Sequence, residues 1–231
     1  MKNILLQHYT GALGELEKLS QANMIKYAEF CGAEYRLLSG DLFNDEYPFS
    51  HTLYAPNQKM HMLSEEFDDY DIVVMVDIDM FTRKGMTENI FTDVKGIGMC
   101  TDFQLHLHKG LKSHFPTLVD LNYPYWGGAI YRLTKEQRKT FREPIRSNLK
   151  DLAKFDRGFN DEGMMHRLAV LTDFKWRAVL PGGFKWCHCS YREGIEDSAM
   201  IHIRPKVTPT GPKRPKIENY REMVRRGLIE E

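Results

Sequence analysis

Apolar residues recur along this chain in two patterns, short runs and stretches in which they are spaced three or four residues apart. The first pattern indicates buried strands and the second indicates amphipathic helices. The runs predict strands at residues 4–6, 34–38, 71–76, 96–100, 125–133 (a turn that leads into a strand), 176–180 and 199–203. The helical spacing predicts helices at residues 15–30, about 57–67, 135–155 with a break at Pro144, 161–171 and 217–226.

The order of these elements predicts an α/β fold. Strands and helices alternate through the first half of the chain, which favours a central, mostly parallel sheet flanked by helices. Residues 41–56 are predicted to form a loop and residues 106–116 an irregular segment. A chain of 231 residues can form one large domain or two small ones. We expect a single domain over residues 1–231, with a Pro- and Lys-rich tail from about residue 207 to 231.

Composition and charge exclude several classes of protein. Lysine plus arginine and aspartate plus glutamate are equally frequent, at 32 each, so no overall field attracts nucleic acid or a membrane surface. The four cysteines are few and scattered, as in the reduced thiols of an intracellular protein. The apolar run near the N-terminus is too short for a signal peptide, and no stretch approaches the roughly 18 apolar residues of a membrane span. We therefore expect a cytoplasmic protein with no transmembrane segment and no nucleic-acid partner.

The most distinctive chemical feature is an aspartate pair, Asp77 and Asp79, directly after the apolar run at residues 72–76. Side chains two residues apart share a face of an extended chain, so both carboxylates point the same way and Ile78 points into the protein. The carboxyl end of a central strand is where open α/β sheets bind ligands. Two carboxylates so close need a positive partner, and a hard divalent ion such as Mg²⁺ or Mn²⁺ suits them. The alternative is a solvated Asp-x-Asp turn.

Other polar residues accompany the pair in a distinctive order. Lys59 precedes it on a predicted helix, a Gly-Gly turn at residues 126–129 opens a later strand, acids begin the helix at 161–171, and His202 follows a late strand. This order, over residues 1–206, resembles the nucleotide-sugar glycosyltransferases of the GT-A fold, in particular the glycogenin and galactosyltransferase-like branch. In that branch a Gly, a Lys and a Pro-Trp pair follow the late His. Here Ile-Arg-Pro-Lys follows His202, without the Gly and the Trp.

The resemblance implies a GT-A type fold, with a Rossmann-like, mostly parallel mixed sheet flanked by helices. It also implies a glycosyltransferase of the hexosyltransferase type, which moves a sugar from a nucleoside-diphosphate donor, UDP-sugar being preferred, to a hydroxyl of a glycan or glycoprotein. The cofactor would be Mn²⁺ or Mg²⁺, held by Asp77, Asp79 and His202. Such an ion stabilises a diphosphate leaving group as a Lewis acid, and a histidine ligand suits Mn²⁺ better than Mg²⁺.

Two segments are expected to contact the donor. Gln7 and Tyr9 follow the first strand, where the resemblance places base and ribose contacts; core packing or a surface loop is the alternative. Gly127 and Gly128 let the backbone approach a ligand where a Cβ would collide, and the neighbouring Trp126 offers a flat face for a sugar ring. The alternative for this second segment is a tight turn beside a core tryptophan.

Cations complete the predicted donor site. Arg204 and Lys206, just beyond His202, would add positive charge beside the diphosphate oxygens. The complete set that we expect to bind the donor is Gln7, Tyr9, Lys59, Asp77, Trp126, Gly127, Gly128, Arg204 and Lys206.

Asp161 and Glu162 are the candidate catalytic residues. A carboxylate in the cleft can deprotonate an acceptor hydroxyl in an inverting transfer, or stabilise the positive charge that develops on the sugar in a retaining one. The structural alternative is equally simple, because Asn160 is a good N-cap and acids in the first turn complement the helix dipole.

Three other functions compete with this hypothesis. A haloacid-dehalogenase-like phosphatase would use Asp77 as nucleophile and Asp79 as general acid, but its motif normally lies near the N-terminus and its later Gly-Asp-x-x-x-Asp motif is not visible. A sugar-nucleotide pyrophosphorylase would need a Gly-rich N-terminal phosphate loop, which this sequence lacks. A non-catalytic nucleotide- or carbohydrate-binding module would use the Asp pair only to hold a structural ion.

Overall fold

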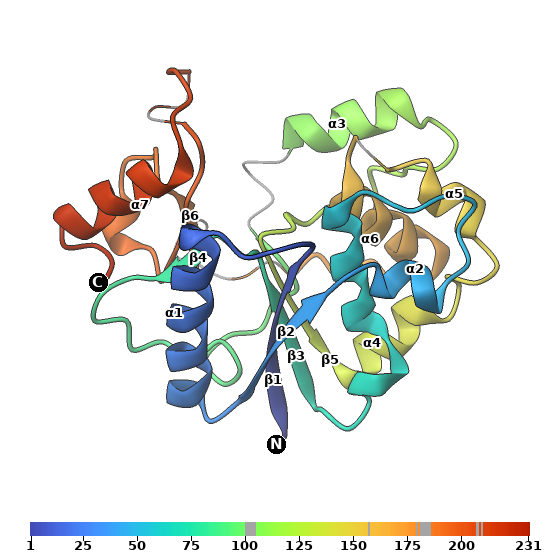
Figure 1. Ribbon diagram of the computed structural model, residues 1–231. Coiled ribbons are helices and arrows are strands. Elements are labelled where there is room, and N and C mark those ends of the chain that lie inside the picture. Colours follow the sequence, from blue (N-terminus) through green and yellow to red (C-terminus); the bar gives the residue numbers. More distant parts are fainter. Residues whose placement is uncertain (100–104, 157, 179, 181–185, 207, 209) are drawn as a thin grey trace.

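A four-stranded sheet in the order β2-β1-β3-β5 forms the centre of the molecule (Figure 1). The computed structural model describes residues 1–99, 105–156, 158–178, 180, 186–206, 208 and 210–231. β1 is parallel to β2 and β3, while β5 runs antiparallel to β3. The prediction of a mostly parallel, mixed sheet is therefore confirmed. Its strands are β1 (Asn3–Tyr9), β2 (Glu34–Ser39), β3 (Ile72–Val76) and β5 (Ile130–Thr134).

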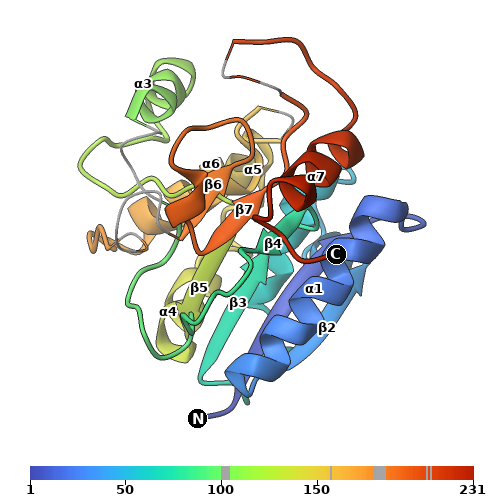
Figure 2. The ribbon, with the colours of Figure 1, turned by 90° about the vertical axis from the view of Figure 1, so that its left-hand side faces the viewer.

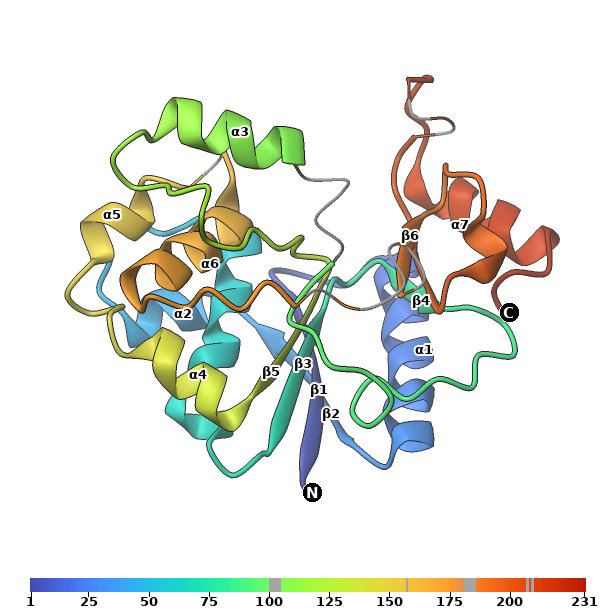
Figure 3. The same cartoon turned by 180° about the vertical axis from the view of Figure 1, so that it is seen from behind.

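Helices cover both faces of this sheet, because alternate residues of a strand point to opposite sides. Val74 and Val76 of β3 pack on the side of α1 (Glu15–Cys31), whereas Val73 and Met75 pack on the opposite side. Figure 3 shows α1 on one side of the sheet and α4 and α6 on the other. The elements of that second side include the 3₁₀ helix η1 (Ala55–Leu63) and the helices α4 (Lys135–Arg142) and α6 (Asn160–Leu171).

A second, three-stranded sheet connects the Asp pair to the late histidine. Its strands, in the order β4-β7-β6, are β4 (Met80–Thr82), β7 (Met200–His202) and β6 (Cys187–Cys189). β4 begins directly after Asp79, and Met80 is the register partner of His202. The C-terminal helix α7 (Lys216–Arg225) packs on this sheet through Tyr220 and Met223. Figure 2 shows α7 beside α1 and against β4 and β7.

Two helices occupy segments in which none was predicted. α2 (Leu42–Glu46) lies in the predicted loop, and α3 (Leu105–His114) in the predicted irregular segment. Leucine and histidine alternate at the start of α3, and such alternation is typical of a strand rather than a helix. The helical pattern that includes the core residue Leu111 is therefore hard to recognise in the sequence. The predicted helix at about 57–67 is instead two 3₁₀ helices, η1 and η2 (Glu65–Phe67). The remaining short helices are α5 (Leu149–Ala153), beyond the predicted break at Pro144, and η5 (Ile195–Asp197).

The segments predicted as strands at 96–100 and 176–180 are not strands in their described parts, but they lie side by side. The N–H of Ile97 donates to the carbonyl of Ala178 at 3.1 Å, and the N–H of Leu180 donates to that of Gly98 at 2.8 Å. Cys100 and Val179 lie outside the described residues. Within the described part of the chain, no helix combines the length and apolar character that crossing a bilayer requires.

Candidate metal and catalytic site

The Asp pair lies in a turn between the two sheets, and backbone hydrogen bonds fix it there. The N–H of Asp77 donates to the carbonyl of Ala129 at 2.9 Å, at the entry to β5, and the N–H of Ile203 donates to the carbonyl of Asp79 at 2.9 Å. β3 ends at Val76, so the pair does not continue the strand as predicted, and Ile78 is only half-buried. The two carboxylates nevertheless point to the same place. The turn that carries them is held to the central sheet at Asp77 and to the small sheet at Asp79.

Asp77, Asp79 and His202 form a group of possible metal ligands. His202 Nε2 lies 3.0 Å from Asp79 Oδ1 and 3.8 Å from Asp77 Oδ2. Each residue offers one ligand atom, and the three atoms lie within 4.8 Å of one another. Two carboxylate oxygens and an imidazole nitrogen are a donor set that suits Mn²⁺. The group therefore fits a divalent metal, as the sequence predicted.

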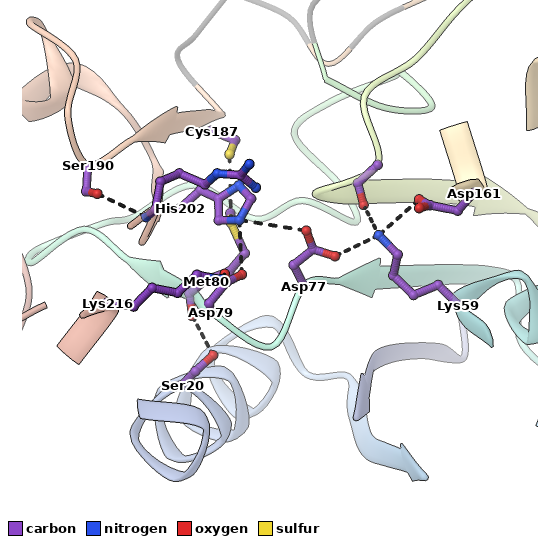
Figure 4. A network of polar contacts seen from close by, with 12 residues as sticks. Ser20, Lys59, Asp77, Asp79, Met80, Asp161, Cys187, Ser190, His202 and Lys216 are labelled. Atoms are coloured by element: carbon purple, nitrogen blue, oxygen red, sulfur yellow. Dashed lines mark hydrogen bonds and ion pairs between the residues drawn. The ribbon is translucent and has the colours of Figure 1, made fainter. Parts of the chain in front are cut away.

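A lysine binds the remaining oxygen of each aspartate (Figure 4). Lys59 Nζ lies 2.7 Å from Asp77 Oδ1, and Lys216, the first residue of α7, pairs with Asp79 Oδ2. Burial alone would raise the pKa of Asp79, but His202 and Lys216 hold it well below its usual value. The repulsion between the two aspartates is thus offset by side chains of the protein itself.

Lys59 joins the Asp pair to the predicted catalytic residues. Its buried ammonium lies 2.7 Å from Asp77 Oδ1, 2.9 Å from Asp161 Oδ2 and 2.8 Å from the carbonyl oxygen of Gly128 (Figure 4). Burial would lower the pKa of Lys59, but the two carboxylates raise it above its usual value. A charged lysine therefore holds together three residues that are widely separated in the sequence.

Asp161 is buried and Glu162 is half-buried in the first turn of α6, and neither is a solvated helix-capping acid. Phe159 occupies the N-cap position, and Asn160 has a φ of 45°, so the predicted asparagine cap is wrong. Burial raises the pKa of Asp161 to about 7, against the opposing effect of Lys59. Burial also raises the pKa of Glu162, which accepts hydrogen bonds from the N–H of Gly128 at 3.0 Å and from the Tyr125 hydroxyl at 2.8 Å.

The glycine at position 128 is explained by its contact with Asp161. A Cβ on Gly128 would lie 2.1 Å from Asp161 Oδ2 and 3.1 Å from the hydroxyl of Tyr131, so only glycine fits at this distance. Gly127 pairs with Met99, whose N–H donates to its carbonyl at 3.3 Å. The predicted close approach of the backbone is therefore present, and its partner within the protein is a candidate catalytic carboxylate.

Two of the predicted donor-binding residues lie in the core. Trp126 is fully buried, packs beside Phe141 and Phe174, and donates its indole N–H to the carbonyl of Ala178 at 3.2 Å. It cannot offer a free ring face to a sugar here, and the core-tryptophan alternative accounts for it. Gln7 is also fully buried, and its amide donates to Ser20 and to the carbonyl oxygen of Asp77, both at 3.0 Å. Gln7 therefore fixes the backbone of Asp77 from within the core.

The other predicted donor residues lie closer to the surface. Tyr9 is half-buried at the carboxyl end of β1. Arg204 is exposed just after β7, and Lys206 is half-buried with its Nζ 5.9 Å from the centre of the Tyr191 ring. Contacts of these three residues with a donor remain predictions. Lys216 was not predicted at all, because 137 positions separate it from Asp79 and no local motif marks it.

The fold is that of known glycosyltransferases, although sequence comparison finds no relative. No family model matches the chain, and no curated protein matches it. The galactosyltransferase LgtC in complex with donor and acceptor sugar analogues matches with a TM-score of 0.52 and 11% identity, over 94% of each chain. An active-site mutant of LgtC gives 0.54 and 11%, over 97% of this chain and 96% of that one. The bifunctional glycosyltransferase WbbM gives 0.55 and 11%, over 97% of this chain and 51% of that one.

At this level of identity the likeness shows the fold alone. The chain has the GT-A glycosyltransferase fold, as the sequence resemblance implied. Its acidic group is compatible with the divalent metal of such enzymes.

Proposed function

We propose that this protein is a metal-dependent glycosyltransferase, which moves a sugar from a nucleoside-diphosphate donor to a hydroxyl of a glycan or glycoprotein. The observation that carries the proposal is the convergence of Asp77, Asp79 and His202 at the carboxyl end of β3, within a glycosyltransferase fold. A UDP-sugar is the preferred donor by resemblance, and Mn²⁺ is the preferred ion because one ligand is an imidazole.

A divalent ion held by these three residues would stabilise the negative charge of the diphosphate leaving group. The residues around it would keep the ligands in place. Lys59 pairs with Oδ1 of Asp77, the oxygen that faces away from His202, and the buried amide of Gln7 donates to the backbone carbonyl of Asp77. Partners of this kind, which orient the metal ligands, are usually needed for full metal affinity.

Asp161 is the residue that we propose acts on the sugar or on the acceptor hydroxyl. Lys59 contacts both Asp161 and Asp77, so only the ammonium group of Lys59 separates the candidate base from the proposed metal ligand Asp77. A carboxyl group with a pKa of about 7 can exchange a proton near neutral pH, where general bases are most effective. Glu162 would position the Gly128 backbone, to which it is hydrogen bonded, rather than react itself.

The phosphatase alternative is not favoured by the surroundings of Asp79. A general acid must carry a proton to donate, but His202 and Lys216 hold the pKa of Asp79 well below its usual value despite its burial. Its carboxyl group is therefore ionised at neutral pH, which suits a metal ligand better than an acid catalyst.

The test is an assay of donor hydrolysis with a panel of UDP- and GDP-sugars, in the presence and absence of Mn²⁺. We expect Mn²⁺-dependent release of nucleoside diphosphate, which Asp79→Asn abolishes and which Asp173→Asn, at an exposed site, leaves unchanged. Release of inorganic phosphate from a phosphate monoester such as p-nitrophenyl phosphate, without release of nucleoside diphosphate from any donor, would instead support the phosphatase. Mn²⁺-dependent nucleotide binding without turnover of any donor would support the binding module.

A further inference from the structure

The charges of the Asp pair are already balanced without a metal. Lys59 pairs with Asp77, and Lys216 pairs with Asp79, so two ammonium groups face two carboxylates. Asp161 also contacts Lys59 and adds at most one further negative charge. A divalent ion that enters this group alone therefore brings more positive charge than the site has left to neutralise.

The two lysines differ in how firmly they are held. The side chain of Lys59 is 9% exposed and also donates to the carbonyl of Gly128. The side chain of Lys216 is 37% exposed, so its ammonium can leave Asp79 for water without crossing the core. Of the two partners of the Asp pair, Lys216 is the one that an incoming ion can displace.

The backbone of Lys216, in contrast, is well anchored beside the metal ligands. Tyr220 packs against Phe81, with ring centres 4.7 Å apart, in a cluster of α7 with β4 and β7. The Asn219 side chain donates to the carbonyl of Arg204 at 2.6 Å, shortly after His202. Lys216 thus begins a helix that is docked on the strands adjoining Asp79 and His202, and its charge stays close to the site even when the ion pair opens.

We propose that Lys216 is a resident counter-ion that makes this site select a divalent ion bound together with a diphosphate over the divalent ion alone. The proposal rests on the proposed function and deepens it. An ammonium at about 5 Å from a divalent ion weakens its binding on the order of tenfold, even with the full screening of water. The negative charge of a diphosphate offsets this repulsion, so ion and nucleotide should each strengthen the binding of the other by the same factor.

The experiment is a titration of Mn²⁺ followed by electron paramagnetic resonance, with and without UDP, at constant pH and ionic strength. Four proteins are compared: wild type, Lys216→Met, Lys216→Arg and Arg221→Met. Methionine keeps most of the apolar stem and removes the charge, while arginine keeps the charge. Arg221→Met is the matched control, because it removes another cation of α7, which pairs with Glu15 at 3.0 Å. Circular dichroism and thermal unfolding check that each variant is folded.

For the wild type we expect weak binding of Mn²⁺ alone and at least tenfold tighter binding with UDP. Lys216→Met should bind Mn²⁺ alone about tenfold more tightly, and UDP should then improve its affinity correspondingly less. Lys216→Arg and Arg221→Met should behave as the wild type does. If Lys216→Met binds Mn²⁺ alone no more tightly than the wild type, the role of Lys216 is wrong while the proposed function stands. If the wild type binds no Mn²⁺ even with UDP or GDP, the proposed metal and donor site itself is wrong.

Discussion

The two halves of the site are built from different parts of the fold and differ in how tightly they are closed. Asp77, Asp161 and Gly128 surround a buried Lys59, on the side of the central sheet. Asp79 directly precedes the small sheet and His202 ends its strand β7, and their cation, Lys216, reaches in from the surface. We call the first half locked, because its buried lysine has three partners within hydrogen-bonding distance. We expect the second half, whose lysine side chain is 37% exposed, to exchange its partner. Chemistry would then be preorganised in the first half and ligand binding regulated in the second.

The strongest test of this comparison removes the buried lysine. Lys59→Met would leave Asp77 and Asp161 facing each other without a counter-charge, and breaking a buried ion pair in this way typically costs about 3–5 kcal/mol. We expect a loss of that order in the free energy of unfolding, measured by urea denaturation at pH 8. The control is Lys154→Met, which removes an exposed pair with Asp151 and should cost less than about 1 kcal/mol. A small effect of Lys59→Met would mean that this half of the site is not locked.

The second test addresses the chemistry of the same half. Asp161→Asn should lower kcat by about 10²-fold or more, the usual range for a general acid–base contribution, with little change in nucleotide affinity. The two quantities are measured by steady-state kinetics and by calorimetry with UDP and Mn²⁺. If kcat stays normal, Glu162→Gln is the next variant to measure, and normal rates in both would remove α6 from the mechanism.

Asp161→Asn should also change how the stability of the protein depends on pH. Burial raises the pKa of Asp161 to about 7 from an ordinary value of 3.8, so between these values the folded protein binds a proton that the unfolded chain releases. The contribution of Asp161 to stability therefore falls as pH rises from about 4 to about 7. Urea denaturation across this range should show a downward trend in the wild type that is weaker in Asp161→Asn. Parallel curves would argue against a raised pKa.

The third test adds a methyl group at Gly128, where the turn before β5 faces Asp161 of α6 in the locked half. Gly128→Ala would bring a Cβ to 2.1 Å from Asp161 Oδ2, and relieving such a clash typically costs about 1–3 kcal/mol. Both melting temperature and kcat should fall. Gly110→Ala is the matched control, because a Cβ there meets open space within α3, and alanine should be neutral or slightly stabilising in a helix.

The smallest expected effect belongs to the exchangeable half. Lys216→Met removes a partly exposed ion pair, and solvent screening limits such pairs to about 1 kcal/mol or less. We expect a shift of this size in the unfolding free energy of the metal-free protein, measured together with Lys59→Met. A loss as large as that of Lys59→Met would show that both halves are locked, and the comparison between them would fail.

The central sheet and the acidic part of the possible metal-binding group could be predicted because their signals are local. The apolar run of β3 leads directly into Asp77 and Asp79, and α1 ends one residue beyond its predicted range, before Gly32 with a φ of 64°. Such features depend on neighbouring residues in the sequence. His202 was added to this group from the order of the motifs, because its distance in the sequence from Asp77 and Asp79 does not by itself connect it to them.

The parts that could not be predicted depend on tertiary contacts. Lys216 reaches Asp79 only because α7 docks on the small sheet, which itself pairs residues more than a hundred positions apart. Trp126 resembled a sugar platform from the sequence, but the packing of Phe141 and Phe174 around it places it in the core. The function of Gly128 likewise follows from where the α6 carboxylate lies, which no local pattern reveals.

The register between Met80 and His202 also bears on how the protein is made. A ribosome synthesises the chain from its N-terminus, and the strands β1, β2 and β3 leave it long before β7 does. The nascent chain can therefore pair the first three strands of the central sheet while the Asp pair still lacks His202 and Lys216. β4 is synthesised long before its partner β7, so Asp77 and Asp79 can meet His202 and Lys216 only after β7 and α7 have been made.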